Sequence, residues 1–150
     1  KHRLNKKITN SNELAKIIER IKKNHNNKKN PATKTFQAIR IYVNQELTEL
    51  ILGLIEATKI LKKGGILIVL SFHSLEDKIV KYFFNFYSNL KNNPSRYFPL
   101  EENNSQLFKV SNKKVLIASK KEILENRKSR SAKLRYAVRN DNTFFFSKRI

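Results

Sequence analysis

The chain has 150 residues, with 32 Lys and Arg against 12 Asp and Glu, and its formal net charge is +20 at pH 7. It has no Cys, which excludes a disulfide framework, a thiol nucleophile and a Cys-based metal site. The longest apolar run, residues 66–70, is far shorter than the roughly 20 residues that a membrane span needs. The chain has no Met and starts with Lys1, which predicts a fragment of a longer parent. No secretory leader opens it, and we expect a cytoplasmic protein that does not bind membranes.

The positive charge is concentrated at the two ends of the chain. Residues 1–34 hold 11 basic and 2 acidic residues, and residues 120–150 hold 10 basic and 3 acidic residues. A positive field of this size favours polyanions such as RNA or DNA. The many Lys residues are also typical of an AT-rich genome, so codon bias is an alternative source of the charge. That bias works against Arg, and five of the nine Arg residues lie in the last 24 residues.

Helices are predicted in the first part of the chain. Asn10 and Glu13 have the spacing of a capping box, which predicts a helix over 12–23. Apolar residues recur every three or four positions over 36–61 and predict one long helical face, which Gly53 bends or divides. The cations and glycines that follow at 62–65 are typical of a helix end.

An α/β unit is predicted next. Residues 66–70 are branched and apolar on both faces, which is typical of a central parallel strand covered by helices on each side. A helix over 75–87 follows, and we expect Ser74 and Asp77 to form its capping box. Helix, strand and helix in this order indicate an α/β fold with a parallel sheet.

The last third of the chain predicts shorter elements. Residues 107–110 and 115–118 are expected to form a hairpin. A short helix over 120–126 and a strand over 133–138 follow. Residues 143–146 fit either an edge strand or a tail packed on the core.

Chemically useful side chains follow the strand at 66–70. Ligands of open α/β sheets bind beyond the carboxyl ends of the strands, and Ser71, Phe72, His73 and Glu76 lie there. We interpret these four as candidate catalytic residues, with His73 outside any capping role. A Phe72 ring that belongs to the core is the alternative.

Two stretches offer cations for phosphate groups. Arg40 lies at the edge of the apolar stripe, where it can hold a phosphate or cover the core with its methylene stem. Residues 127–135 hold five cations in nine positions, and a solvated face is the alternative reading. The three His residues have no spaced carboxylate partners and predict no metal site. The predicted RNA-binding residues are Lys34, Arg40, Arg127, Arg130, Lys133 and Arg135.

Three motifs carry a resemblance to a known family. They are residues 31–44 (PATKTFQAIRIYVN), 64–81 (GGILIVLSFHSLEDKIVK) and 129–135 (SRSAKLR). In this order they closely resemble the bacterial small-subunit rRNA cytosine-N4 methyltransferases, the RsmH (formerly MraW) family. The resemblance covers the C-terminal half of the family, whose glycine-rich loop for S-adenosylmethionine would lie in an absent N-terminal half. Asn30 departs from the family, which usually has His at that position.

The resemblance implies an α/β fold, the C-terminal part of a class I S-adenosylmethionine-dependent methyltransferase with a Rossmann-like sheet. Residues 1–35 would end an inserted helical, substrate-recognition domain, and residues 36–150 would belong to the methyltransferase domain. The last strands would close a mostly parallel sheet with an antiparallel hairpin.

The implied reaction is methyl transfer from S-adenosylmethionine to the exocyclic N4 amine of a cytidine in the decoding region of 16S rRNA. Phe72 could then stack on the base, His73 could accept from the amine, and Arg40 and the cations of 127–135 could hold phosphates. We expect the fragment to be inactive alone, to act on the small ribosomal subunit, and to self-associate as a homodimer if it exposes an apolar face. A non-catalytic basic RNA-binding module is the alternative.

Overall fold

The computed structural model of the chain describes residues 7–22, 30–88, 106–112 and 114–144. It divides into two compact units, Lys1–Glu46 and Leu47–Ile150. This division lies farther along the chain than the domain boundary expected at residue 35. The assignment of residues 1–35 to a substrate-recognition domain stays a prediction.

The first unit holds two helices, α2 (Ser11–Ile21) and α3 (Thr33–Val43). Asn10 caps α2 as predicted, because its Oδ1 accepts a hydrogen bond from the backbone N–H of Glu13 at 2.8 Å. The Glu13 carboxylate accepts in turn from the backbone N–H of Thr9 at 3.2 Å. The first bond satisfies an N–H that helix geometry leaves unpaired, and the second holds the backbone just before the cap.

The apolar stripe predicted over 36–61 is divided between α3 and α4 (Glu46–Ile60). The break lies at Asn44 and Gln45, and Gln45 has a φ of 51°, in the left-handed region. One left-handed residue turns the chain out of the helical path and so ends α3. Gly53 lies inside α4, and the expectation that it divides the helix is wrong.

The sheet is built around its last strand, β4 (Lys133–Arg139). Strand β1 (Ile66–Ser71) pairs with β4 in antiparallel register along one edge. The short strands β2 (Phe108–Lys109) and β3 (Leu116–Ile117) both pair with the other edge, also antiparallel. The mixed α/β class is confirmed, but no parallel pair occurs among the residues that the structure describes. The hairpin expected between the segments of β2 and β3 is wrong, because each takes β4 as its partner.

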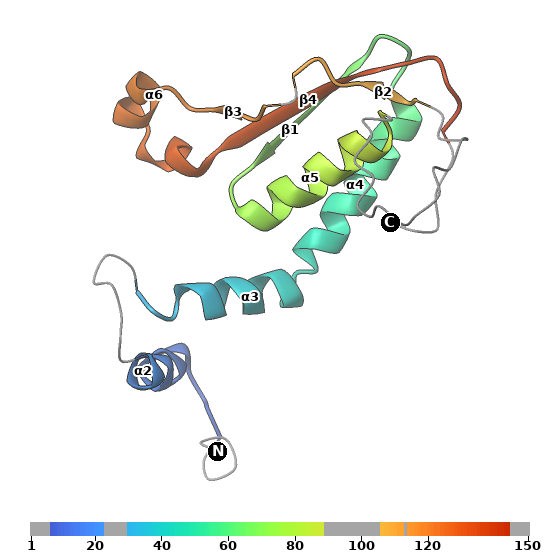
Figure 1. The fold of residues 1–150 in the computed structure, drawn as a ribbon. Coiled ribbons are helices and arrows are strands. Elements are labelled where there is room, and N and C mark those ends of the chain that lie inside the picture. Colours follow the sequence, from blue (N-terminus) through green and yellow to red (C-terminus); the bar gives the residue numbers. More distant parts are fainter. Residues whose placement is uncertain (1–6, 23–29, 89–105, 113, 145–150) are drawn as a thin grey trace, which may run out of the picture. The chain divides into compact units, whose positions relative to one another are not determined.

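Helices α4 and α5 (Ser74–Phe86) lie on one side of this sheet (Figure 1). Phe83 and Phe84 of α5 are 1% and 2% exposed, and Phe84 packs edge-on against Phe108 of β2 at a centroid distance of 5.5 Å. Removing this apolar surface from water at about 25 cal/mol per Å² holds α5 on the sheet. The buried core consists of Leu54, Ile55, Val80, Phe83, Phe84, Tyr87, Leu107, Phe108 and Ala137.

The opposite face of the sheet is apolar and exposed. Ile66, Ile68 and Leu70 of β1 are 55%, 60% and 53% exposed, whereas Leu67 and Val69 pack against the core. Side chains alternate between the two faces of a strand, so the three exposed residues share one face. The register places Leu134, Tyr136 and Val138 of β4 beside them. A strand that we expected to be covered on both faces is therefore covered on one.

The remaining predicted elements are confirmed within the described residues. The short helix is α6 (Lys120–Glu125), and the predicted strand at 133–138 is β4. A 3₁₀ helix, η1 (Arg127–Ser131), connects them. Phe144 packs against the ring of Tyr87 at a centroid distance of 5.7 Å, as expected of a packed tail.

Phe145 and Phe146, which end the segment expected to be an edge strand or a packed tail, lie outside the described residues. Among the helices that are described, none combines the length and the apolar character needed to cross a bilayer.

Candidate functional site

The candidate site lies where β1 ends and β4 begins. Ser71 is in register with Lys133, and its Oγ donates a hydrogen bond to the carbonyl oxygen of Lys133 at 3.3 Å. Ser71 is 4% exposed, so this hydroxyl joins two strand ends inside the protein. The start of α5, the 3₁₀ helix η1 and α6 lie at this same end of the sheet (Figure 1).

His73 and Glu76 form the capping box of α5. Nδ1 of His73 accepts from the backbone N–H of Glu76 at 3.3 Å, and Oε2 of Glu76 accepts from the backbone N–H of His73 at 3.3 Å. Because Nδ1 accepts, a neutral imidazole carries its proton on Nε2, which lies 3.1 Å from Oε1 of Glu76. The expectation that Ser74 and Asp77 form the box, with His73 outside it, is wrong.

Phe72 is the exposed side chain of this turn. Its residue is 54% exposed, so the alternative reading of a core position is wrong. Its backbone N–H donates to Oε2 of Glu76 at 2.9 Å, and the same oxygen holds the N–H of His73. One carboxylate thus fixes the backbone on which the ring stands. An exposed aromatic ring on a fixed backbone is suited to stack on a nucleic-acid base.

Asp77 joins α5 to β4 through two cations. Its Oδ1 lies 2.7 Å from Nε of Arg135, and its Oδ2 lies 3.3 Å from Nη2 of the same guanidinium. Nζ of Lys133 lies 3.4 Å from Oδ2. The side chains of Asp77 and Arg135 are only 12% and 13% exposed, so this bidentate pair lies largely out of water. Bidentate pairs between Arg and a carboxylate are among the strongest polar contacts in proteins.

The pKa of Asp77 reflects two opposing effects. Burial by itself raises the pKa of the carboxyl, because it disfavours the charged form. The hydrogen bonds and the positive charges of Arg135 and Lys133 outweigh that penalty and hold the pKa below its ordinary value of 3.8. Asp77 is therefore ionised at neutral pH and serves as the counter-charge of two buried or half-buried cations.

This role of Asp77 was not predicted from the sequence. A signal for it was present, since Lys133 and Arg135 stand two positions apart on a strand and so share one face. Ala137 of the same face is fully buried, which places both cations on the side covered by α5. Buried charges are normally paired, so two cations on a covered face favour a carboxylate from the covering helix.

Arg127 and Arg130 are exposed on η1, which leads into β4. Asn126 starts η1, since its Oδ1 accepts from the backbone N–H of Lys128 at 3.1 Å. The hydroxyl of Ser129 is buried and donates to the carbonyl oxygen of Asn126 at 2.8 Å. In the described part of the chain, no carboxylate lies within ion-pair distance of either arginine. These two cations are therefore available to an external anion.

The other two predicted RNA-binding residues lie on α3 in the first unit. Arg40 makes a bidentate pair with Glu46, with Nε 2.7 Å from Oε1 and Nη2 3.1 Å from Oε2. Lys34 is exposed. The six predicted RNA-binding residues thus differ in kind, because three pair with carboxylates of the chain and three have no ion-pair partner among the described residues.

Comparison with known proteins identifies the family. The profile of the MraW methylase family matches residues 1–140. The chain belongs to this family. It is 48% identical over 138 residues to the ribosomal RNA small subunit methyltransferase H of Anaplasma phagocytophilum, which covers 91% of this chain and 41% of that protein. It is 42% identical over 142 residues to the protein of the same name from Ruegeria sp., covering 94% and 43%. The chain spans less than half the length of these MraW relatives.

The glycines that the structure describes before β1 of this MraW-family chain do not form the loop expected to bind S-adenosylmethionine. The expected glycine-rich loop would follow a strand, but Gly64 and Gly65 precede β1. Gly64 has a φ of 74° and serves the turn after α4, where its N–H donates to the carbonyl oxygen of Arg139 at 2.9 Å. No step that involves the methyl donor follows from the residues of this chain.

We expect Asp77→Asn to lower the free energy of unfolding by about 3 kcal/mol at pH 7, because it leaves a buried guanidinium without its counter-charge. The native pKa of Asp77 is depressed, so this stability is present above the unfolded pKa of about 4 and lost as the pH falls through the native value. Urea unfolding of the wild type and the variant, from pH 7 down into acid, measures the difference in their free energies of unfolding.

Glu56→Gln is the matched control, because Glu56 is 63% exposed and pairs with an exposed lysine. We expect it to cost much less, with little dependence on pH. Equal losses of unfolding free energy in the two variants would contradict the role given to Asp77. So would a loss in Asp77→Asn that stays the same in acid.

Proposed function

We propose that this chain forms the RNA-acceptor side of an rRNA methyltransferase. The proposed reaction moves a methyl group from S-adenosylmethionine to the exocyclic N4 amine of a cytidine in the decoding region of 16S rRNA. The relatives are ribosomal RNA small subunit methyltransferases by name, which supports an rRNA substrate. The observation that carries the proposal is that an exposed ring, Phe72, and the exposed cations Arg127 and Arg130 lie at the same end of the sheet.

The reaction is mainly a positioning task. The lone pair of the cytidine amine is delocalised into the ring, so the amine attacks well only when it is held in line with the methyl group. When bound, S-adenosylmethionine would supply the methyl group, and the residues of this chain would hold the amine in position. A base taken out of its stack needs a surface to lie against, and the ring of Phe72 offers one.

The neighbouring residues act by holding that ring in place. Glu76 binds the backbone N–H groups of Phe72 and His73, and Ser71 fastens the end of β1 to β4. His73 spends its one acceptor nitrogen on the helix cap, so a positioning role is better supported than proton acceptance. Arg127 and Arg130 are proposed to hold RNA phosphates beside the base.

The ring of Phe72 is tested by turnover in a chimera, in which this chain replaces the matching part of the Anaplasma phagocytophilum relative. We expect Phe72→Ala to lower turnover about ten- to hundredfold, because stacking on one base contributes about 1–3 kcal/mol. Phe72→Tyr keeps the ring and is expected to keep most of the activity. Equal activity in Phe72→Ala and the unaltered chimera would contradict the proposed acceptor site.

The role of His73 is tested in the same chimera by a pair of variants. Asn is a good helix cap and lacks the imidazole, so His73→Asn should stay within about threefold of full turnover. His73→Ala removes the cap, which is worth about 1 kcal/mol, and should lower both stability and turnover. If His73→Asn loses turnover as completely as His73→Ala while RNA affinity is unchanged, His73 contacts the reacting amine and the positioning role is wrong.

The exposed and the paired cations should differ in RNA binding. We expect Arg127→Gln with Arg130→Gln to reduce the slope of log affinity against log salt by about 2, one for each lost phosphate contact. Arg135→Gln should leave the slope nearly unchanged and lower stability instead. Fluorescence anisotropy with a labelled RNA over a salt series measures the slopes. A larger slope change for Arg135→Gln than for the double variant would contradict the assignment.

The isolated chain is expected to differ from the whole protein in activity and in self-association. We propose that the chain alone is inactive, since its described glycines do not form the loop expected to bind the methyl donor, and that it works in the cytoplasm on the small ribosomal subunit. A homodimer through the exposed apolar face of β1 and β4 is proposed for the isolated chain. Sedimentation of the chain gives a dimer mass on this proposal and a monomer mass if it fails.

A further inference from the structure

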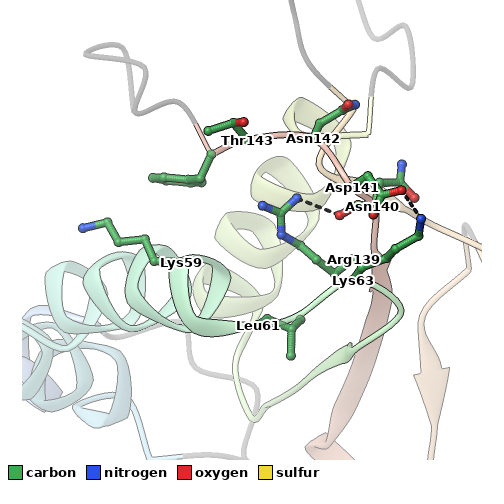
Figure 2. A pocket seen from close by; sticks show the side chains of 9 residues that line it. Lys59, Leu61, Lys63, Arg139, Asn140, Asp141, Asn142 and Thr143 are labelled. Atoms are coloured by element: carbon green, nitrogen blue, oxygen red, sulfur yellow. Dashed lines mark hydrogen bonds and ion pairs between the residues drawn. The ribbon is translucent and has the colours of Figure 1, made fainter.

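A second group of cations lies at the opposite end of the sheet from Phe72. An open hollow of about 580 Å³ is lined by the last turn of α4, the turn that follows it and the chain after β4 (Figure 2). This volume falls within the range of about 300–1,000 Å³ that is usual for ligand pockets. Its lining includes three cations, Lys59, Lys63 and Arg139, and one carboxylate, that of Asp141.

Arg139 is buried beside this hollow. The residue is 8% exposed, and its Nη1 donates to the carbonyl oxygens of Leu107 at 3.2 Å and Asn140 at 3.3 Å. A guanidinium offers five N–H donors, and these two contacts use one nitrogen only. Its Nε is buried without a hydrogen-bond partner in the described structure.

The charge of Arg139 is not compensated by a carboxylate among the described residues. Asp141 also lines the hollow, but its carboxylate pairs with Nζ of Lys63 (Figure 2). Buried charges in proteins are normally paired, because leaving one unpaired costs several kcal/mol. Arg135, on the same strand, follows this rule through its pair with Asp77. Carbonyl oxygens satisfy part of the hydrogen bonding of Arg139 but bring no negative charge.

The rim of the hollow adds positive charge. Lys59 lies on the last turn of α4 with its side chain 47% exposed, and it pairs with the exposed Glu56. Thr143, whose side chain bears a hydroxyl, also lines the hollow (Figure 2). A planar guanidinium with an ammonium and a hydroxyl nearby is a donor set suited to phosphate oxygens.

We propose that this hollow binds a phosphate group, with Arg139 as its counter-charge and Lys59 at its rim. The site is separate from the one that contains Phe72, because β1 spans six residues between the two ends, or about 20 Å at 3.3 Å per residue. It therefore adds to the proposed function and stands without it. The phosphate can belong to an RNA backbone or to a small phosphate-bearing molecule.

The site is tested by thermal unfolding of the chain in sodium phosphate against sodium chloride at equal ionic strength. A ligand that binds only the folded state raises the melting temperature. We expect the wild type to be stabilised by phosphate, with an affinity at least about tenfold higher than that of Arg139→Gln. Lys59→Gln, which alters only an exposed lysine, should also weaken binding, and it keeps the test decisive if Arg139→Gln folds poorly.

Lys78→Gln is the matched control, since it removes one exposed charge of α5 outside the hollow. The rise of its melting temperature in phosphate should equal that of the wild type. This comparison separates binding from the general stabilising effect of phosphate salts. Equal shifts in Lys59→Gln, Lys78→Gln and the wild type would overturn the proposal.

RNA binding then distinguishes the two sources of phosphate. A lower affinity of Lys59→Gln for a labelled RNA, together with its lost phosphate shift, supports an RNA phosphodiester. An unchanged RNA affinity with the same lost shift supports a small phosphate-bearing molecule. Neither measurement uses methyl transfer, so the proposed reaction can fail while this site stands.

Discussion

The carboxylate of Asp77 connects the parts on which the candidate site depends. It lies one residue after Glu76 on α5, and it holds Arg135 and Lys133 of β4. The same first turn of α5 therefore fixes the turn that carries Phe72 and fastens the helix to the sheet. Hydrophobic packing of α5 is non-directional, whereas this bidentate pair sets the position of the helix start relative to β4.

This constraint divides the basic motif at 127–135 by function. The cations on β4 point to the covered face and neutralise Asp77, whereas Arg127 and Arg130 precede the strand and are exposed. A cation that neutralises a buried carboxylate contributes to folding, and it offers little to a phosphate outside. The net charge of the chain therefore overstates the number of cations available to RNA, because some of them are held by its own carboxylates.

Much of the fold could be predicted from local patterns in the sequence. Apolar periodicity indicated the helices and the strands β1 and β4, and the cap at Asn10 was recognised from its spacing to Glu13. The strand pairing could not be predicted in this way, because β2 and β3 are two residues long and acquire their register from β4. The break at Gln45 could not be predicted either. The break was expected at Gly53, and nothing in a glutamine side chain favours the left-handed backbone that Gln45 adopts.

The end of β1 was predicted as the place of the candidate site, and only the contacts in the structure show what each residue there does. His73 and Ser74 are both plausible caps from the sequence, and the choice between them depends on where the backbone turns. Asp77 has the spacing of a capping residue from Ser74, yet the facing strand supplies stronger partners. Arg139 looks like one more basic residue, and its burial follows only from the tertiary packing of the strand that contains it.

A double-mutant cycle between Asp77 and Arg135 measures how strongly the two side chains stabilise the fold together. The free energy of unfolding is measured for the wild type, Asp77→Ala, Arg135→Met and the double variant, and Lys59 with Glu56 serves as an exposed reference pair. The pair of Asp77 and Arg135 should show a coupling of about 2 kcal/mol, and the reference pair less than about 0.5 kcal/mol. A coupling near zero between Asp77 and Arg135 would contradict the account.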